Sequence, residues 1–438
     1  MKRKSFCTLV ICLLIAPIFH THAKGPVDLV DLRTAAIDHI RNRHGVVLFY
    51  NAEANKHLPG FSKYVDQPYY DILFGMGHSI TDTDLAILKY LPEIHSVNIP
   101  DITIKGDGFE HLKPLRKLRI LYLLDRGLTD DDIEGVSHLT QLRELELRSG
   151  NITCAGMIHV SKLSNLEVLR LCWTNVSNEG MQHLIGLKNL RVLNIWGSKI
   201  TKEGLGYIAQ LQQLEEFKLW GTNVTDEGMS VLCRATGLKK LIIDDAEITD
   251  KSLEHVASLS HLQNFSVPYH RITDVGLAHL ASLSELTELD MAGTIISNKG
   301  LRHLRGMKKL EILDIHYTKI TGAGIKHLVV LPNLARLNLS CNSITNDSLK
   351  TLLKMKQLRW LELEDIKITD PSLPIIGQLT ELRYLNLCNT SITDAGLPFL
   401  ASLQSLEKIN LRNTQVTIEG IKQLKKALPN CNVIYVQH

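Results

Sequence analysis

Residues 392–415 read ITDAGLPFLASLQSLEKINLRNTQ, and the stretch begins with an aliphatic residue. An aliphatic residue recurs every 24 positions in fifteen repeat units, at Ile80, Ile104, Leu128, Ile152, Val176, Ile200, Val224, Ile248, Ile272, Ile296, Ile320, Ile344, Ile368, Ile392 and Val416. A fixed period of this length predicts one supersecondary unit stacked on copies of itself. Such a stack forms one long continuous surface, which favours binding over chemistry as the function.

The spacing of apolar residues changes within each unit. Counted from the aliphatic marker as offset 0, they return at offsets 5, 8, 11 and 14, and then at offsets 17 and 19. A spacing of three suits one face of a helix, and a spacing of two suits alternate residues of a strand. Each unit is therefore predicted to be a helix followed by a short strand.

Small and polar residues mark the start of each predicted helix. Offset 1 is Thr or Ser in 14 of 15 units, with Lys105 as the exception, which predicts a hydroxyl N-cap. Offset 2 is Asp in seven units, where its charge would meet the helix dipole. Offset 4 is Gly in ten units and Ser or Asp in the others, at a cost in helix propensity. We expect this position to pack closely against the neighbouring unit.

The geometry of stacked units predicts the overall shape. Neighbouring strands lie ~4.8 Å apart, whereas packed helices need ~8–10 Å. A stack of helix-strand units must therefore curve, with a parallel sheet inside and helices outside. The predicted fold class is an α/β horseshoe whose inner sheet measures roughly 70 Å along its arc.

Segments such as Ile392–Leu397 (ITDAGL) and Leu382–Leu387 (LRYLNL) resemble the 24-residue, helix-containing leucine-rich repeats called GALA-type, which are similar to those of ribonuclease inhibitor. The resemblance covers the chain from about Ile80 to the C-terminus. It implies a right-handed leucine-rich-repeat solenoid of about 15 repeats, and it leaves the function open because such repeats serve many unrelated partners.

The residues outside the repeats divide into three parts. Residues 1–23 combine Lys2, Arg3 and Lys4 with an uncharged apolar stretch and a small-residue cleavage pattern, which predicts a secretory signal peptide, with an uncleaved anchor as the alternative. Residues 24–79 are expected to form an N-terminal cap, with a helix at 32–43, strands at 46–50 and 69–74, and a loop between the strands. Residues 80–438 form the solenoid, which ends in a divergent capping unit.

Composition limits the function classes. Without residues 1–23 the chain has 46 Lys+Arg and 46 Asp+Glu, so it lacks the basic footprint of nucleic-acid binding. Seven His residues share offset 7 on the outer helices, too far apart to bind one metal ion. Catalytic and cofactor motifs are not found, so we expect no enzyme, no cofactor and no metal. We also expect a monomer without a membrane span after signal cleavage, which is secreted, periplasmic or attached to the cell envelope.

The candidate site is the open inner surface, called here the concave face. The buried strand residues hold offsets 17 and 19, so offsets 16, 18 and 20 point into the open side and offsets 21 and 23 continue along its rim. All four Trp fall on these positions: Trp173, Trp196, Trp220 and Trp360. The first three lie in successive units, and we predict that they form one aromatic ledge. The alternative is that they only shield the sheet edge.

Further candidates extend this surface. Tyr269, His270, His316 and Tyr317 continue the aromatic character two to four units beyond the ledge. Charged candidates form three groups along the same side. The basic N-terminal flank is Arg148 and Arg170, the acidic middle is Asp244, Asp245, Asp290 and Asp314, and the second acidic cluster is Glu362, Glu364 and Asp365. Such a distribution can steer a charged partner. Ordinary solvated surface charge is the alternative for each of them.

Three functions fit these residues. The first is protein recognition on the concave face, centred on the Trp ledge. The second is binding of a glycan or cell-wall polymer to the same Trp side chains. The third follows from the resemblance alone, since some similar repeat arrays are substrate adaptors of ubiquitin ligases or effectors directed at host cells.

Overall fold

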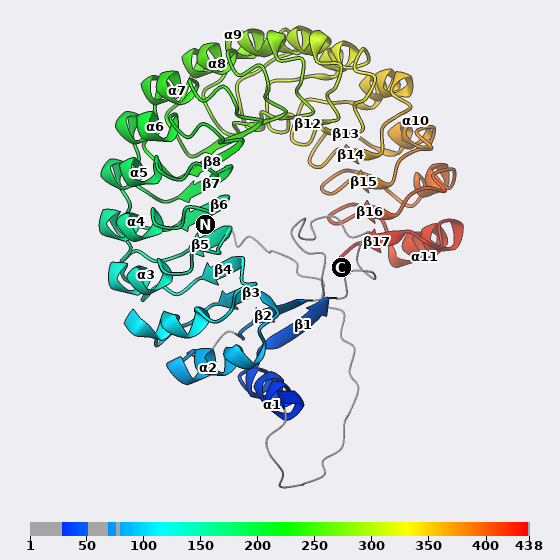
Figure 1. Cartoon of the computed structure of the whole chain (residues 1–438). Coiled ribbons are helices and arrows are strands. Elements are labelled where there is room, and N and C mark those ends of the chain that lie inside the picture. The colour runs from blue at the N-terminus through cyan, green and yellow to red at the C-terminus, as the bar shows by residue number, and fades with distance from the viewer. Residues whose placement is uncertain (1–28, 51–68, 76–78, 105, 437–438) are drawn as a thin grey trace.

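The computed structural model describes residues 29–50, 69–75, 79–104 and 106–436. They form an open horseshoe, with the strands lining the inner side and the helices the outer side (Figure 1). The predicted α/β fold class, with its concave parallel sheet and convex helices, is confirmed. The predicted signal peptide, most of the loop between the two strands of the N-terminal segment, and the exceptional Lys105 lie outside the described residues.

The described strands belong to one 17-stranded sheet. Their bounds are β1 (Val46–Tyr50), β2 (Tyr69–Leu73), β3 (Ile94–Ile99), β4 (Ile120–Leu123), β5 (Glu144–Leu147), β6 (Val168–Cys172), β7 (Val192–Trp196), β8 (Glu216–Trp220), β9 (Lys240–Asp244), β10 (Asn264–Ser266), β11 (Glu288–Asp290), β12 (Ile312–Asp314), β13 (Arg336–Asn338), β14 (Trp360–Glu362), β15 (Tyr384–Asn386), β16 (Lys408–Asn410) and β17 (Asn432–Ile434).

The convex side carries α-helices in the earlier repeats and mainly 3-10 helices from η4 onward. The α-helices are α1 (Leu29–Asn42), α2 (Asp82–Ala86), α3 (Asp130–Val136), α4 (Cys154–Val160), α5 (Asn178–Leu184), α6 (Lys202–Ile208), α7 (Asp226–Leu232), α8 (Asp250–Val256), α9 (Asp274–His279), α10 (Leu373–Ile376) and α11 (Ile418–Ala427). The 3-10 helices are η1 (Ile87–Tyr90), η2 (Gly106–Leu112), η3 (Leu280–Ser282), η4 (Gly300–Gly306), η5 (Gly322–His327), η6 (Asn346–Lys354), η7 (Asp370–Ser372) and η8 (Leu397–Leu400).

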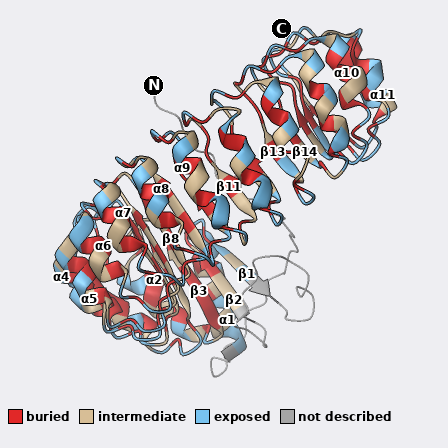
Figure 2. Cartoon of the chain, turned by 90° about the horizontal axis from the view of Figure 1, so that it is seen from above, coloured by how far each residue is buried: buried red, intermediate tan, exposed pale blue. Residues whose placement is uncertain are grey.

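The 24-residue period sets the register of the sheet. From β3 to β16, each strand pairs in parallel with the next, and each residue lies beside the residue 24 positions later, as in Leu289 beside Leu313 and Leu313 beside Leu337. At the N-terminal end, β1 instead runs antiparallel to β2, which begins the parallel series. The sheet does not close: the first and last repeats face each other in Figure 1 but lie at opposite ends of the molecule in Figure 2.

One continuous hydrophobic core runs through the stack. Fourteen of the fifteen marker residues are buried, and Val416 in the last unit is partly buried. The Leu residues at offsets 17 and 19 close the inner side of the same core. Helix α1 lies against the first repeat, where His39 and Arg43 contact the fully buried Asp84 carboxylate at 2.6 and 3.1 Å.

Successive repeats are joined by hydrogen bonds from the start of one helix to the side chain at offset 2 of the previous unit. The carboxylate of Asp130 accepts hydrogen bonds from the Thr153 amide (2.8 Å), the Thr153 hydroxyl (2.6 Å) and the Gly156 amide (2.9 Å). We call this contact the Asx clamp. Nine junctions have it: Asp130–Thr153, Asn178–Thr201, Asp226–Thr249, Asp250–Thr273, Asp274–Ser297, Asn298–Thr321, Asn346–Thr369, Asp370–Thr393 and Asp394–Thr417. The Asp at offset 2 therefore caps the next helix, in addition to meeting the dipole of its own.

The Asx clamp explains the small residue at offset 4. A Cβ atom on Gly156 would lie 2.5 Å from the Asp130 Oδ1 atom, so glycine leaves room for the carboxylate at this junction. Ser252 fits by donating its hydroxyl to Asp226 at 2.5 Å. Where the preceding offset 2 is Gly, the unit caps its own helix: Asp132 and Ser348 each form a capping box with the Thr at offset 1.

Replacement of the clamp carboxylate should destabilise the stack. We expect Asp130→Ala to lower the free energy of unfolding by about 2 kcal/mol, because it removes three charge-assisted hydrogen bonds. The exposed Asp131 one position later is the matched control, and Asp131→Ala should cost no more than about 0.5 kcal/mol. Gly156→Ala should destabilise the parent chain and become neutral or stabilising in the Asp130→Ala background. Denaturant unfolding measures all four variants, and strictly additive effects would contradict the contact.

Candidate functional site

The strands present alternate side chains to the core and to the concave face. In β7, Leu193 and Ile195 are buried, whereas Val192, Asn194 and Trp196 are half-buried on the open side. The same alternation holds for β4, β5, β8 and β9. Offsets 16, 18 and 20 therefore carry side chains that the repeat core does not constrain.

The strands from β6 to β16 are each followed by a turn residue at offset 21 with a left-handed backbone. Its φ lies between 52° and 67° in eleven successive units, from Trp173 to Asn413. Gly, Asn and Asp hold seven of these positions and tolerate such a backbone. Three positions instead carry a bulky aromatic residue, namely Trp173, Tyr269 and Tyr317, whose exposed fractions are 57%, 60% and 64%. Aromatic side chains are thus held in solvent at positions where glycine would be less strained.

The three neighbouring Trp residues lie on successive units. The rings of Trp196 and Trp220 meet edge to face, with centroids 5.0 Å apart and an interplanar angle of 78°. The Trp173 ring covers the next turn, because a Cβ on Gly197 would lie 2.6 Å from its Cε3 atom. The predicted ledge therefore consists of a contacting pair, Trp196 and Trp220, and of Trp173 over the adjacent turn.

A positively charged hollow lies beside Trp173. It has a volume of about 430 Å³ and is lined by Arg126, Arg148, Ser149, Gly150 and Trp173; we call it the basic hollow. Both guanidinium groups are exposed, and within the described part of the chain neither makes a side-chain hydrogen bond or ion pair. Two arginine forks beside an indole face suit a carboxylate or another planar anion.

Arg170 lies one unit further along and is already paired. Its guanidinium contacts the Glu144 carboxylate, which also accepts a 2.5 Å hydrogen bond from the Tyr122 hydroxyl. Burial raises the pKa of the adjacent Glu146. The charge of Arg170 is therefore balanced within the face. The parallel register places Arg170 beside Glu146 and so could have indicated an acidic neighbour, although the ion pair forms with Glu144, two residues earlier on the same strand.

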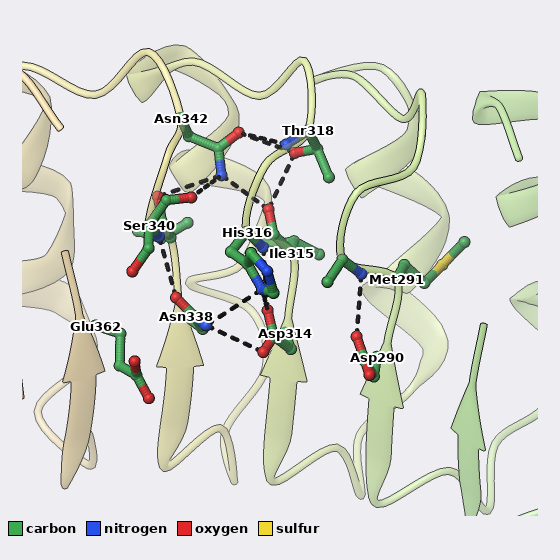
Figure 3. Close-up of polar contacts among 12 residues, drawn as sticks. Asp290, Met291, Asp314, Ile315, His316, Thr318, Asn338, Ser340, Asn342 and Glu362 are labelled. Atoms are coloured by element: carbon green, nitrogen blue, oxygen red, sulfur yellow. Dashed lines mark hydrogen bonds and ion pairs between the residues drawn. The ribbon is translucent and has the colours of Figure 1, made fainter. Parts of the chain in front are cut away.

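A second hollow of about 500 Å³ lies on the same rim in later repeats, and Figure 3 shows the polar contacts of His316, Asn338 and Ser340, which line it. We call it the acidic hollow; its lining residues are Tyr269, His316, Tyr317, Asn338, Ser340, Cys341, Glu362 and Glu364. His316 is held on both sides, with Nδ1 2.7 Å from the Asp314 Oδ1 atom and Nε2 3.0 Å from the Tyr269 hydroxyl. The hydrogen bond with Asp314 raises the pKa of His316.

The remaining acidic candidates are partly buried beside these hollows. Burial raises the pKa of Asp290, which accepts hydrogen bonds from the Ser266 hydroxyl at 2.8 Å and the Ala292 amide at 3.0 Å. Burial also raises the pKa of Asp244, whereas Asp245 is exposed in its turn. His270 is buried and accepts a hydrogen bond from the Ala246 amide, so it supports the turn and does not extend the aromatic surface.

Trp360 lies at the opposite edge of the strands, away from the other three Trp residues. It stacks on Tyr384 at a centroid distance of 3.7 Å, and its indole N–H donates to Glu362 at 2.7 Å. Arg336 and Lys408 cover the outer ring faces at 5.4 and 5.6 Å. Arg336, Tyr384 and Lys408 were missed from the sequence, although they share offset 16 with Trp360 in consecutive units.

The described residues do not meet the requirements of a metal site, a disulfide or a membrane-spanning helix. Within residues 29–50, 69–75, 79–104 and 106–436, His, Cys, Asp and Glu form no group of three that could hold a metal ion. The six cysteines in these ranges are free thiols. None of the helices in these same ranges is long and apolar enough to cross a membrane.

Comparison with known proteins agrees with the geometry. A leucine-rich repeat family model matches residues 308–366. A leucine-rich-repeat protein of Leptospira interrogans is 19% identical, with a TM-score of 0.52, over 79% of this chain and 91% of that one. The mouse RP105/MD-1 complex matches at 18% identity and TM-score 0.53, over 81% and 69% of the two chains. An internalin of Listeria monocytogenes is 24% identical, with a TM-score of 0.49, over 78% of this chain and 86% of that one. No curated protein sequence matches.

The chain therefore has the fold of a leucine-rich-repeat protein, and this coarser part of the sequence prediction is confirmed. The GALA-type assignment of the repeats stays a prediction. None of the comparisons tests the candidate residues of the concave face.

Two glycines provide a test of how the Trp173 ring is held. Gly197→Ala and Gly221→Ala place an alanine at equal φ values of 64° and 63°, but only the Cβ at 197 meets the indole. We expect Gly221→Ala to cost about 1–2 kcal/mol from the left-handed backbone alone. Gly197→Ala should cost about 1 kcal/mol more by overpacking. Denaturant unfolding measures both, and the difference should vanish in a Trp173→Ala background; a persistent difference would contradict this placement of the ring.

The pair of His316 and Asp314 predicts a specific titration. His316 should titrate above the ordinary histidine value of about 6.5, and Asp314→Asn should lower its pKa. Because the folded pKa is raised, the pair's stabilisation is fully present below the unfolded pKa and is lost as the pH rises through the folded pKa. NMR of the imidazole protons measures this, with His270 as an internal contrast because burial lowers its pKa. A His316 pKa at or below 6.5 would rule the pairing out.

Proposed function

We propose that the chain is a non-enzymatic recognition protein that binds a protein partner on its concave face. The observation that carries this proposal is the exposure of Trp173, Tyr269 and Tyr317 in left-handed turns, where an aromatic residue costs stability. Aromatic side chains supply much of the binding energy at protein interfaces. A role in binding therefore explains why they are kept at positions where they lower the stability of the fold.

The surroundings of these side chains support the proposal. The basic and acidic hollows lie on the same rim as the Trp ledge, so apolar contact area is flanked by charge of both signs. Interfaces between proteins combine an aromatic centre with a polar rim in this way. RP105 of the mouse, which shares the fold, was solved as a complex with MD-1.

A glycan is the second candidate ligand. The exposed indole of Trp173 could stack on a sugar ring, and Arg126 and Arg148 could bind an acidic sugar. This alternative uses only the basic hollow and leaves the acidic hollow without a role. We also propose, from residues 1–23, that the protein is secreted, periplasmic or attached to the envelope, and that it acts as a monomer.

The Trp pair should be essential for partner binding. We expect Trp196→Ala combined with Trp220→Ala to weaken binding at least about thirtyfold, because the contacting pair acts as one aromatic hot spot, which contributes about 2 kcal/mol or more. Photo-crosslinking captures the partner and mass spectrometry identifies it; calorimetry with the purified partner then measures the affinity. A glycan array on the same variants separates a sugar ligand from a protein.

Phe399 provides the matched control for this experiment. It is a 50% exposed aromatic residue in η8 on the convex side, so Phe399→Ala should leave binding unchanged. If the Trp196 and Trp220 variant stays folded by circular dichroism and binds like the parent chain, the concave face is not the binding surface.

A further inference from the structure

The concave rim is polarised along the arc. The basic hollow lies at the turns after β4, β5 and β6, the Trp pair at the ends of β7 and β8, and the acidic residues from β9 to β14. We propose that this surface binds one extended polypeptide segment with an acidic end, an apolar middle and a basic end. The inference rests on the proposed function and names the chemistry of the partner.

The basic hollow suits the acidic end of such a segment. Arg126 and Arg148 are exposed and make no ion pair among the described residues. The next arginine, Arg170, forms an ion pair with Glu144. A carboxylate entering the hollow would find two guanidinium groups with free donors and the face of Trp173. The surrounding backbone does not fill this space, because a Cβ on Gly150 would meet only the Trp173 carbonyl, at 3.9 Å.

The acidic hollow suits the basic end. Glu362 and Glu364 line it, and the Asp314 carboxylate lies 2.7 Å from Nδ1 of the lining residue His316. The rings of Tyr269 and Tyr317 stand at its edge and can cover the stem of a lysine or arginine side chain or contact its cation.

The nearby positive side chains do not line the hollow: Arg412, two strands after β14, donates its Nε to Asn410 at 3.1 Å. Arg336 covers Trp360 at the other edge of the strands, and Lys218, four strands before β12, is paired with Glu216 at 2.8 Å. His316 is the titratable cation within the hollow, and Asp314 and Asp290 lie next to it. The hollow keeps excess negative charge even when His316 is protonated.

The separation of the hollows sets the length of the segment. Their centres lie about seven strands apart, which corresponds to roughly 34 Å along the arc at ~4.8 Å per strand. An extended chain advances ~3.3 Å per residue, so roughly ten residues are needed to span the distance. The Trp pair lies between the hollows and would contact the apolar middle.

The mixed charge favours a polypeptide over other polymers. Nucleic acids and acidic polysaccharides carry negative charge along their length, so they could satisfy only the basic hollow, and neutral polysaccharides could satisfy neither hollow through charge. A polypeptide carries carboxylates, cations and apolar side chains in one chain at chosen spacing. Charge complementarity therefore selects this class of ligand.

The test uses fluorescein-labelled synthetic peptides and the purified chain in an anisotropy assay. The dipolar peptide has two aspartates, a Leu-Phe centre and two arginines, with about ten residues between the charged ends, and is made in both chain directions. Comparison peptides are all-acidic, all-basic, or dipolar with half the spacing. We expect the long dipolar peptide, in one of its two directions, to bind about tenfold tighter than every comparison peptide at low salt, and salt to reduce the difference.

Charge reversal at each hollow tests the assignment of the ends. Arg126→Glu with Arg148→Glu should weaken the dipolar peptide about tenfold and make the all-basic peptide the preferred ligand. Glu362→Lys with Glu364→Lys should in turn make the all-acidic peptide the preferred ligand. A misfolded variant would lose all peptides, so a switch in preference is separable from loss of structure.

The outcomes separate this inference from the proposed function. The inference of a polarised segment is wrong if an all-acidic or all-basic peptide binds the parent chain best, or if the spacing of the charges has no effect. The proposed function would still stand if the Trp196 and Trp220 variant loses its partner. If no peptide shows selective binding up to about 1 mM, the inference is also overturned. The partner capture experiment then decides separately whether the concave face binds a folded protein surface.

Discussion

A hydrogen-bonded side chain at offset 2 sets how one repeat stacks on the next. In Asp130 one carboxylate satisfies the amides of Thr153 and Gly156 and the Thr153 hydroxyl, which are the exposed donors at the start of the following helical turn. The same contact recurs at nine junctions. Glycine at offset 4 is the usual steric consequence, because a Cβ on Gly156 would lie 2.5 Å from the oxygen that makes the contact, and Ser252 is accommodated by donating its hydroxyl to that carboxylate. The convex side is thus held at a fixed spacing by polar contacts, while the core leucines hold the concave side.

This division leaves the concave face free to vary. The core uses offsets 17 and 19, and the Asx clamp uses offsets 1, 2 and 4, so offsets 16, 18, 20 and 21 carry no repeated structural duty beyond the turn. Most residues that line the two hollows lie at these offsets. At Trp173, Tyr269 and Tyr317 the left-handed backbone lowers the stability of the fold, and the packing of the other repeats offsets that loss.

Much of the face follows from the offset of each residue, and its pairings follow from neighbouring units. The offset placed Trp196 and Trp220 on adjacent strands, and they contact each other in the structure. Arg170 was expected on a basic flank, but Glu144 one strand earlier takes its charge. Trp360 was grouped with the other three Trp residues, whereas it stacks with Tyr384 at the far edge of the strands. Offset gives a residue's position within its unit, and side-chain reach across units decides its partner.

The sequence by itself determined the repeat, the parallel register and the side of the sheet on which each residue lies, because a period of 24 without insertions leaves only one way to align the units. It also indicated where each helix begins, through Thr or Ser at offset 1. Only the tertiary structure decided that the Asp at offset 2 acts on the following unit, that the turns at offset 21 are left-handed, and that two hollows of opposite charge share one rim. Those features depend on side-chain directions and on distances between chain segments 24 or more residues apart, which the period brings together without specifying their contacts.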